Sequence, residues 1–374
     1  MVSIIIPTLN SKQYISQAIQ SILNQSYKDY EIIIVDDGSA DNTYEELKKY
    51  EDKIKYYYKK NGGVASARNY GMLKANGEYI CFLDADDMYK EEKLKEQVEF
   101  LENNPEIDVV YNNVDVVDEE LNFINILKSE GVYENRKDFL TMLLVRQIIP
   151  GPASIMIRRK CVESGIKYNE EYRHAEDYDF TLKLAKKFNV GYIPKSLYIY
   201  RRHQSNLTNE HKKQFNNEIE IIKKIGIENI KSVVWESNFT ESMKKLIFSK
   251  ILIKINEWDQ AKNVLLDILK NEEIAIAYFY LGNCYYFLER YEEAKDCYEQ
   301  SIIVDKSLAE SFNNLGCVCI KLDKLGEAKI NFNNALHMRK NYMDARINLD
   351  NINQENYNCK ITEKELRKIL TVYK

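Results

Sequence analysis

The sequence predicts two domains of different class, an α/β domain with a mixed, mainly parallel sheet followed by an all-α helical-repeat domain. The chain has 374 residues, more than one ordinary hydrophobic core organises. Residues 1–205 alternate short β-branched runs with amphipathic helical stretches, as strands that alternate with helices do. The C-terminal third instead matches itself when the sequence is shifted by 34 residues, which indicates helical repeats.

Short apolar runs in the N-terminal part predict its strands. In chain order, the expected strands are Val2–Ile6, Glu31–Val35, Ile54–Tyr58, Tyr79–Leu83, Asp108–Asn112 and Ser154–Ile157. Helical patterns lie between them, among them Ser11–Asn24 and Glu91–Glu102. Sheets of this class bind ligands at the carboxyl ends of their strands, so we expect the functional residues there.

The repeat in the C-terminal third rests on matched residues. The pairs 34 residues apart are Leu281-Gly282 with Leu315-Gly316, Ala294 with Ala328, Tyr298 with Phe332 and Ser301 with Ala335. A degenerate upstream unit contains Trp258, Ala261 and Leu265. The pattern resembles a tetratricopeptide-repeat array, in which small residues let paired helices approach closely. Such arrays usually bind an extended peptide or a partner protein in a groove; a helical spacer or a dimerisation surface is the alternative.

These patterns place the domain boundaries. We expect the α/β domain at residues 1–205, a helical linker at 206–245 and the repeat domain at 246–374. Residues 360–374 are expected to form a C-terminal capping helix, with Leu366, Ile369, Leu370 and Tyr373 on one face. We interpret that face as a cap on the repeat stack, and contact with a bilayer surface is the alternative.

Composition excludes several classes of protein. The net charge of −5 and pI of about 5.7 give no electrostatic footprint for nucleic acid. No run of about 18 apolar residues predicts a transmembrane helix, and the first residues enter a strand pattern rather than a signal peptide. The seven cysteines are scattered without a Cys-x-x-Cys pair, which favours buried thiols in a reducing compartment. We therefore expect a cytoplasmic protein.

Two polar loops follow the first two strands. The first contains Pro7, Thr8, Leu9 and Asn10, and the second contains Asp36 and Asp37. Neither has the Gly-x-Gly-x-x-Gly turn of a dinucleotide-binding fold. A carboxylate at this edge is able to bind a nucleobase N–H or a ribose hydroxyl, and Asp37 is the preferred candidate. For Asp36, turn and helix capping is an equal alternative to nucleotide binding.

A glycine-containing loop precedes the next helical pattern. It runs from Asn61 through Gly62 and Gly63, and Arg68 lies in the second turn of the following helix. Helix N-terminal amides and a guanidinium group both suit a diphosphate. Arg68 is therefore a candidate nucleotide contact, with a solvated surface arginine as the alternative.

The strongest local signal is the acidic triplet Asp84-Ala85-Asp86, which follows the apolar strand Tyr79–Leu83. Carboxylates so close together repel one another unless a cation is present. Mg²⁺ and Mn²⁺ are held by one or two carboxylates and completed by water and phosphate oxygens. The triplet therefore predicts a divalent-metal and nucleotide site.

Five motifs in order give a resemblance to a known family. VSIIIPTLN, IIIVDDGSADNT, GGVASARNYG, YICFLDADD and AEDYDF resemble the family 2 glycosyltransferases of GT-A fold. The resemblance covers residues 1 to about 205. It implies that Asp37 contacts the nucleobase, that Arg68 and Asp84 contact the nucleotide, and that Asp86 holds the metal.

The same resemblance assigns the catalytic base. In Ala175-Glu176-Asp177-Tyr178-Asp179, Asp177 matches the position of the family's base, with Glu176 in support. These residues begin a helical pattern, where the helix dipole favours an ionised carboxylate; capping alone is the alternative. Downstream, His203 is a further candidate metal ligand, with a solvated loop residue as its alternative.

The resulting hypothesis is an inverting, metal-dependent glycosyltransferase. It moves a hexose or N-acetylhexosamine from a UDP-sugar to a hydroxyl or thiol, on a protein or peptide held by the repeats. One alternative is transfer to a lipid-linked glycan or cell-wall polymer, with peripheral contact to a membrane. The other is an inactive transferase domain that serves as a repeat scaffold.

Overall fold

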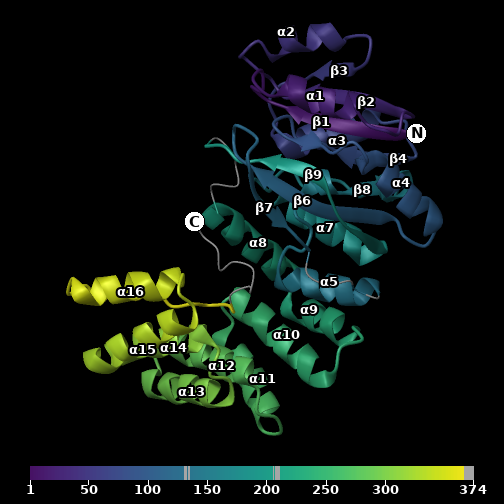
Figure 1. The fold of residues 1–374 in the computed structure, drawn as a ribbon. Helices are drawn as coiled ribbons and strands as arrows, with labels where there is room; N and C mark the ends of the chain where they lie inside the picture. Colours follow the sequence, from purple (N-terminus) through teal and green to yellow (C-terminus); the bar gives the residue numbers. More distant parts are fainter. Residues whose placement is uncertain (130–132, 134, 205, 207–210, 366–374) are drawn as a thin grey trace. The chain divides into compact units, whose positions relative to one another are not determined.

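The computed structural model describes residues 1–129, 133, 135–204, 206 and 211–365. The chain forms two compact units, Met1–Gly226 and Ile227–Lys374, which Figure 1 shows as a sheet-and-helix unit and an all-helical unit. The predicted fold class is therefore confirmed. The predicted boundaries at residues 205 and 245 differ from this division, because the segment predicted as a linker is divided between the units.

A nine-stranded sheet is the framework of the first unit within the described residues. Its strands are β1 (Val2–Thr8), β2 (Tyr30–Asp36), β3 (Lys55–Tyr58), β4 (Tyr79–Phe82), β5 (Met88–Tyr89), β6 (Val109–Val117), β7 (Phe123–Leu127), β8 (Met156–Arg158) and β9 (Val190–Arg201). Each of the six predicted strands overlaps one of these. The sequence analysis missed β5, β7 and β9; β9 contains Pro194, which lies where the β6–β9 register shifts, and proline within a run argues against a regular strand.

The mixed sheet is as predicted. Its strand order is β3-β2-β1-β4-β8-β6-β9-β5, with β7 paired to β6. β1 pairs in parallel with β2 and β4, and β2 with β3. β8, however, runs antiparallel to both β4 and β6. The sheet is therefore mixed, and its parallel half, β3-β2-β1-β4, carries the predicted loops.

Helices cover both faces of the parallel half (Figure 1). α1 (Ile15–Leu23) and α4 (Lys93–Asn103) share one core cluster with Val2, Ile4 and Ile6 of β1. Ile5 faces the other way, where a β-carbon at Gly71 of α3 (Val64–Lys74) would clash with it. α7 (Glu176–Lys187) lies on this second face through Phe180, whose ring meets Phe82 edge-on. The alternation along β1 is that of a strand buried on both faces.

Further helices and turns complete the first unit. They are α2 (Thr43–Leu47), α5 (Arg136–Val145), α6 (Arg159–Glu163), α8 (His211–Ile225) and two 3₁₀ turns at Lys48–Tyr50 and Pro152–Ser154.

The second unit is built of helix pairs, as the sequence predicts. Its helices are α9 (Ile227–Trp235), α10 (Glu241–Lys254), α11 (Trp258–Leu269), α12 (Ala275–Phe287), α13 (Tyr291–Val304), α14 (Ala309–Lys321), α15 (Leu325–Met338) and α16 (Met343–Asn353). A β-carbon at Gly282 would lie 2.6 Å from the ring of Tyr298, and one at Gly316 would lie 2.5 Å from the ring of Phe332. The two matched glycines therefore make the same close helix contact in successive pairs.

The structure describes only part of the segment predicted as a C-terminal capping helix, residues 360–374. Most of the predicted capping helix falls on residues 366–374, outside the described residues. Residues 360–365 are not helical, because their main chain is bonded to side chains of the repeats instead. All seven cysteines are free thiols, and six of them are buried. In the described ranges, no helix combines the length and the apolar character that crossing a membrane needs.

Candidate active site

The predicted loops meet at the carboxyl edge of the parallel strands. Thr8 at the end of β1 is in register with Asp36 at the end of β2, and Ile5 of β1 is in register with Phe82, the last residue of β4. Asp84 follows β4 by two residues. Parallel pairing thus brings these three strand ends to one edge, as the fold class predicts.

The loop after β1 is tied to the loop after β2. The Asn10 N–H donates to Ser39 Oγ at 2.9 Å, and Asn10 Oδ1 accepts from the Ala40 N–H at 2.8 Å. Pro7 and Thr8 are buried, whereas Leu9 is 44% exposed. Thr8 Oγ1 is buried without a hydrogen-bond partner among the described residues. Asn10 therefore has a structural part in shaping this edge.

Asp36 uses both carboxylate oxygens within the protein. Oδ1 accepts from the main-chain N–H groups of Gly38 and Ser39 at 3.1 and 2.7 Å, and Oδ2 accepts from the Tyr56 hydroxyl at 2.9 Å. Asp36 therefore stabilises the turn that follows β2.

Asp37 joins the β2 loop to the glycine loop. Oδ1 is 2.6 Å from Lys59 Nζ and accepts from the Gly62 N–H at 2.9 Å, while Oδ2 accepts from the Gly63 N–H at 2.7 Å. Gly63 has a φ of 89° and begins α3, a conformation that glycine adopts without strain. Asp37 therefore holds the loop from which α3 and Arg68 start.

Arg68 connects the end of β4 to the start of α7. Its side chain is 4% exposed, with Nη2 2.8 Å from Asp84 Oδ1 and Nη1 3.2 Å from Glu176 Oε1. Its guanidinium also lies 5.3 Å from the ring centroid of Tyr168. Burial opposes its charge, but Asp84, Tyr168 and Glu176 raise the pKa of Arg68 above its usual value. Its Nε is buried without a partner in the described part of the chain.

Asp86 faces a different set of side chains. Its Oδ2 lies 2.9 Å from His203 Nε2 and 3.4 Å from Asn206 Nδ2, and the His203 ring stacks on Tyr14 with centroids 5.2 Å apart. Burial and the charge of Asp84 raise the pKa of Asp86, although His203 opposes the shift. Ala85, between the two carboxylates, is 5% exposed.

The donors around Asp86 fit a divalent cation that completes its shell from a substrate. Over the described residues, no group of three or more His, Cys, Asp and Glu side chains is placed to hold a metal alone. A carboxylate and an imidazole are present, and burial together with the neighbouring charge of Asp84 raises the pKa of Asp86, a shift that a bound cation would oppose. Ions of this class commonly take one or two protein ligands and fill the rest with phosphate oxygens and water.

Asp87 has a structural role that the motif alone did not predict. It is 1% exposed. It accepts hydrogen bonds from the Tyr198 hydroxyl and, at 2.7 Å, from the Arg201 N–H. Burial and the neighbouring Asp86 and Asp84 raise its pKa well above the usual value. Asp87 therefore attaches the acidic loop to β9, which brings His203 to Asp86.

Asp177 lies in the first turn of α7, next to Glu176. Its Oδ1 accepts from the Tyr178 N–H at 2.8 Å, whereas its Oδ2 accepts no hydrogen bond from a described residue. Burial, reinforced by the charge of Glu176, raises the pKa of Asp177 to about 7. A carboxylate with a free oxygen and a pKa near neutrality is suited to accept a proton from a substrate.

Sequence reasoning missed the residues that connect these parts. Glu176 appeared only as support for Asp177, yet it is the carboxylate that Arg68 bridges to Asp84. Asn206 was also missed, although its position three residues after His203 in one short loop was a usable signal. Tyr14 and Tyr168 carried no signal, because stacking across distant segments leaves no local pattern.

Comparison with known proteins identifies both parts of the chain. Residues 3–165 match the model for glycosyl transferase family 2, and residues 275–308, which contain α12 and α13, match the model for a tetratricopeptide repeat. The crystal structure of TarS from S. aureus superposes with a TM-score of 0.51 at 20% identity, over 82% of this chain and 55% of that chain. That likeness shows the fold.

Relatives in sequence match half of the chain or more. A protein of Rickettsia conorii, named an uncharacterised glycosyltransferase, is 39% identical over 190 residues, which is 50% of this chain but only 31% of that protein. The chain thus spans less than a third of the length of this relative. A Haemophilus influenzae protein with the same description is 34% identical over 191 residues, or 50% of this chain and 72% of its own length. On this identity, and on the family model that matches its first strands and motifs, the chain belongs to glycosyl transferase family 2.

Proposed function

We propose that this chain is an inverting, metal-dependent glycosyltransferase that moves a sugar from a UDP-sugar to a hydroxyl or thiol of a polypeptide. The observation that carries the proposal is the Arg68 bridge. Through Asp84 and Glu176, it joins the strand edge expected to bind the nucleotide to the helix that carries Asp177. Donor recognition and proton transfer therefore have residues in one connected network.

In this proposal the donor lies along the strand edge. Asp37 contacts the nucleobase beside the loop of Pro7, Thr8, Leu9 and Asn10, and Asp84 with Arg68 contacts the ribose and diphosphate. Arg68 Nε and Thr8 Oγ1 have no hydrogen-bond partner among the described residues. This supports the proposal, because buried polar atoms normally find a hydrogen-bonding partner. Asp36 contributes by holding the loop that presents Asp37.

A divalent cation, Mn²⁺ or Mg²⁺, would be held by Asp86 and His203, with the diphosphate oxygens of the donor as further ligands. When bound, it supplies positive charge to the departing diphosphate. Imidazole is a softer ligand than a carboxylate and suits Mn²⁺ better than Mg²⁺. Asn206 supports this pair by its contacts with both Asp86 and His203.

Asp177 is the general base of the proposed reaction. Its free Oδ2 takes the proton from the acceptor hydroxyl or thiol as the acceptor attacks the anomeric carbon. The bond from that carbon to the diphosphate breaks, and UDP leaves with the electron pair. Attack opposite the leaving group inverts the configuration. Glu176 keeps Arg68 in place and raises the pKa of Asp177 through its charge.

The polypeptide acceptor is inferred from the repeats, since such arrays commonly bind extended peptides. The sugar of this proposal is a hexose or an N-acetylhexosamine, and a panel of UDP-sugars distinguishes between them.

The test is UDP release from a panel of UDP-sugars, with Mn²⁺ or Mg²⁺ and with or without a library of Ser-, Thr- and Cys-containing peptides. We expect metal-dependent release from one or a few donors and faster release with peptide. Asp86→Asn should abolish the metal dependence, whereas Asp52→Asn, at an exposed loop position, should leave it unchanged. Release that is absent for every donor, or that ignores the Asp86 substitution, contradicts the proposal.

A further inference from the structure

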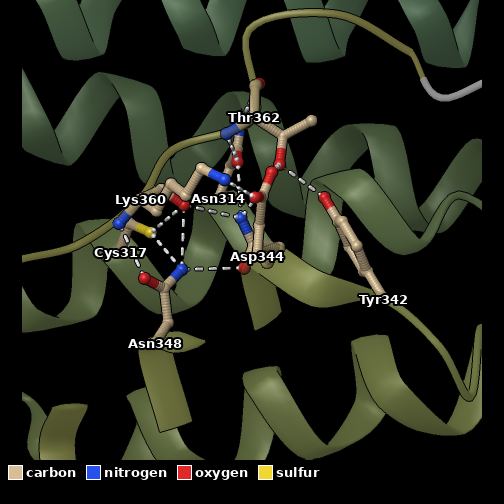
Figure 2. Close-up of polar contacts among 8 residues, drawn as sticks. Asn314, Cys317, Tyr342, Asp344, Asn348, Lys360 and Thr362 are labelled. Carbon is tan, nitrogen blue, oxygen red and sulfur yellow. Dashed lines mark hydrogen bonds and ion pairs between the residues drawn. The ribbon is translucent and has the colours of Figure 1, made fainter. Parts of the chain in front are cut away.

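The repeats already hold an extended peptide, which is the chain's own residues 356–365, called here the tail segment. It lies against α12, α14 and α16. Figure 2 shows Lys360 and Thr362 of this segment among Asn314, Cys317, Tyr342, Asp344 and Asn348. The contacts are made chiefly to the main chain of the tail segment.

Two asparagines each bond both polar groups of one tail residue. Asn314 Oδ1 accepts from the Thr362 N–H and Asn314 Nδ2 donates to the Thr362 carbonyl oxygen, both at 2.8 Å. Asn348 does the same with Lys360, at 2.6 Å to the N–H and 2.9 Å to the carbonyl oxygen. A side-chain amide thus pairs with a main-chain amide as a neighbouring β-strand would.

A second row of side chains donates to carbonyl oxygens of the same segment. Asn283 Nδ2 donates to the Thr362 carbonyl at 3.3 Å, Cys317 Sγ donates to the Lys360 carbonyl at 3.7 Å, and Asn351 Nδ2 donates to the Asn358 carbonyl at 2.9 Å. Together with Asn314 and Asn348, these residues form what we call the amide ladder.

The amide ladder has a fixed register. Asn314 and Asn348 are 34 residues apart, and so are successive members of the row Asn283, Cys317 and Asn351. Each step of one repeat toward the C-terminus moves the contact two residues back along the tail segment. Two residues are the period of an extended strand, about 6.6 Å. The repeat spacing is therefore matched to extended polypeptide running in the opposite direction.

The repeats contact side chains of the tail segment at few positions. Thr362 is 4% exposed. Its hydroxyl lies 2.5 Å from the Tyr342 hydroxyl and donates to Asp344 Oδ2 at 2.9 Å. Lys360 Nζ is 2.7 Å from Asp344 Oδ1, while Glu363 and Lys364 are exposed. Of the apolar side chains in the tail segment, Tyr357 is 47% exposed and Ile361 is only partly buried, which is unlike a permanent part of a hydrophobic core.

We propose that the amide ladder is a binding site for extended polypeptide, and that the tail segment occupies it as an exchangeable ligand in cis. An external ligand is an extended segment with a hydroxyl residue at the position of Thr362 and a basic residue at the position of Lys360. It binds when it displaces the tail segment. This inference concerns binding alone and holds whether or not the first unit transfers a sugar.

The test uses the full chain with the tail segment disengaged by proline. Lys360→Pro and Thr362→Pro together remove the two N–H groups that Asn348 and Asn314 accept. Ile361→Pro is the matched control, because the Ile361 N–H bonds no described residue. The probe is a fluorescein-labelled peptide of residues 356–365, and its binding is measured by fluorescence anisotropy. We expect the double variant to bind the probe at least tenfold more tightly than the wild type and the control do.

A substitution in the amide ladder checks the site. In the double-proline background, Asn314→Ala should weaken probe binding at least tenfold. Asn331→Ala is its control, since the Asn331 amide bonds Glu327 O within α15, and it should leave binding unchanged. Equal probe binding by wild type and double variant overturns the proposal. So does a double variant that dimerises where the wild type is monomeric, because a second copy is then the occupant.

A measurement on the wild type avoids any folding defect of the variants. Hydrogen exchange of residues 356–365 is followed by mass spectrometry, with and without excess peptide of the same segment carrying Ile361→Ala so that its mass differs. Displacement predicts at least tenfold faster exchange of the Lys360 and Thr362 amides when the peptide is added. Unchanged protection at saturating peptide overturns the proposal, because it makes the tail segment a fixed structural cap.

Discussion

The strand edge of the first unit and the amide ladder of the second are both polar, but they differ in how their polar groups are satisfied. At the strand edge, carboxylates work against one another: burial and Asp84 raise the pKa of Asp86, and burial with Asp86 and Asp84 raises that of Asp87. In the amide ladder, neutral side chains are paired with neutral main chain. The first arrangement favours a cation, whereas the second favours the main chain of an extended peptide.

The largest expected effect is the loss of turnover when the proposed general base is replaced. Asp177→Asn should lower turnover by about two to four orders of magnitude, the usual contribution of a general base, and leave donor affinity unchanged. Steady-state UDP release together with calorimetric titration of UDP measures both. Asp179→Asn, on the same helix and ion-paired to Lys183, is the control. Turnover within threefold of the wild type removes Asp177 from the base role.

Removal of the Arg68 guanidinium should have the next largest effect, a loss of stability. Arg68→Met leaves Asp84 and Glu176 without their shared partner, and breaking a buried ion pair from one side costs about 3–5 kcal/mol. Urea denaturation of both proteins measures the change in the free energy of unfolding. Arg290→Gln breaks the exposed pair with Glu293 and should cost below about 1 kcal/mol. Similar losses in the two variants contradict the structural importance assigned to Arg68.

The amide ladder lies on helices of the second unit, whose packing depends on close contacts at glycine. Gly316→Ala puts a β-carbon 2.5 Å from the Phe332 ring, so we expect a loss of about 1–3 kcal/mol from overpacking. Gly326→Ala is a matched control in the next helix, because no atom lies within 4 Å of its β-carbon. That control should gain up to about 1 kcal/mol from helix propensity. Thermal unfolding compares the two variants, and equal effects exclude the contact as the reason for Gly316.

The smallest expected effect is the pH dependence of turnover, which tests the electrostatics of the strand edge. Because the pKa of Asp177 is raised to about 7, the base is protonated below that pH, and turnover should fall about tenfold per unit below pH 7 and level off above it. The free energy of unfolding should change with pH in the opposite direction to turnover. The native state keeps this proton to a higher pH than the unfolded chain does, so the contribution to stability is lost as pH rises from about 4 through 7.

Two measurements separate these effects. The pH profile of kcat should show the apparent pKa near 7, and urea denaturation at each pH should show the stability change in the wild type but not in Asp177→Asn. A flat kcat profile between pH 5 and 8 contradicts the assignment of Asp177 as the titrating base.

The sequence by itself predicted six strands, among them β1, β2, β3 and β4, which lead into loops of the site. It also predicted the helix starting at Glu176 and the repeat of Gly282 and Gly316. These features are local, since they depend on residue periodicity and on motifs of a few residues. The strand edge followed as well, because parallel strands bring their carboxyl ends together.

Only the tertiary structure decided which groups are free and which are bonded. It paired β9 with β6 despite Pro194, joined Asp84 to Glu176 through Arg68, and left Asp177 Oδ2 without a described partner. It also laid the tail segment, predicted to start a helix, along the amide ladder. The reason is common to these cases: the deciding hydrogen bonds join residues far apart in the chain, so no local pattern records them.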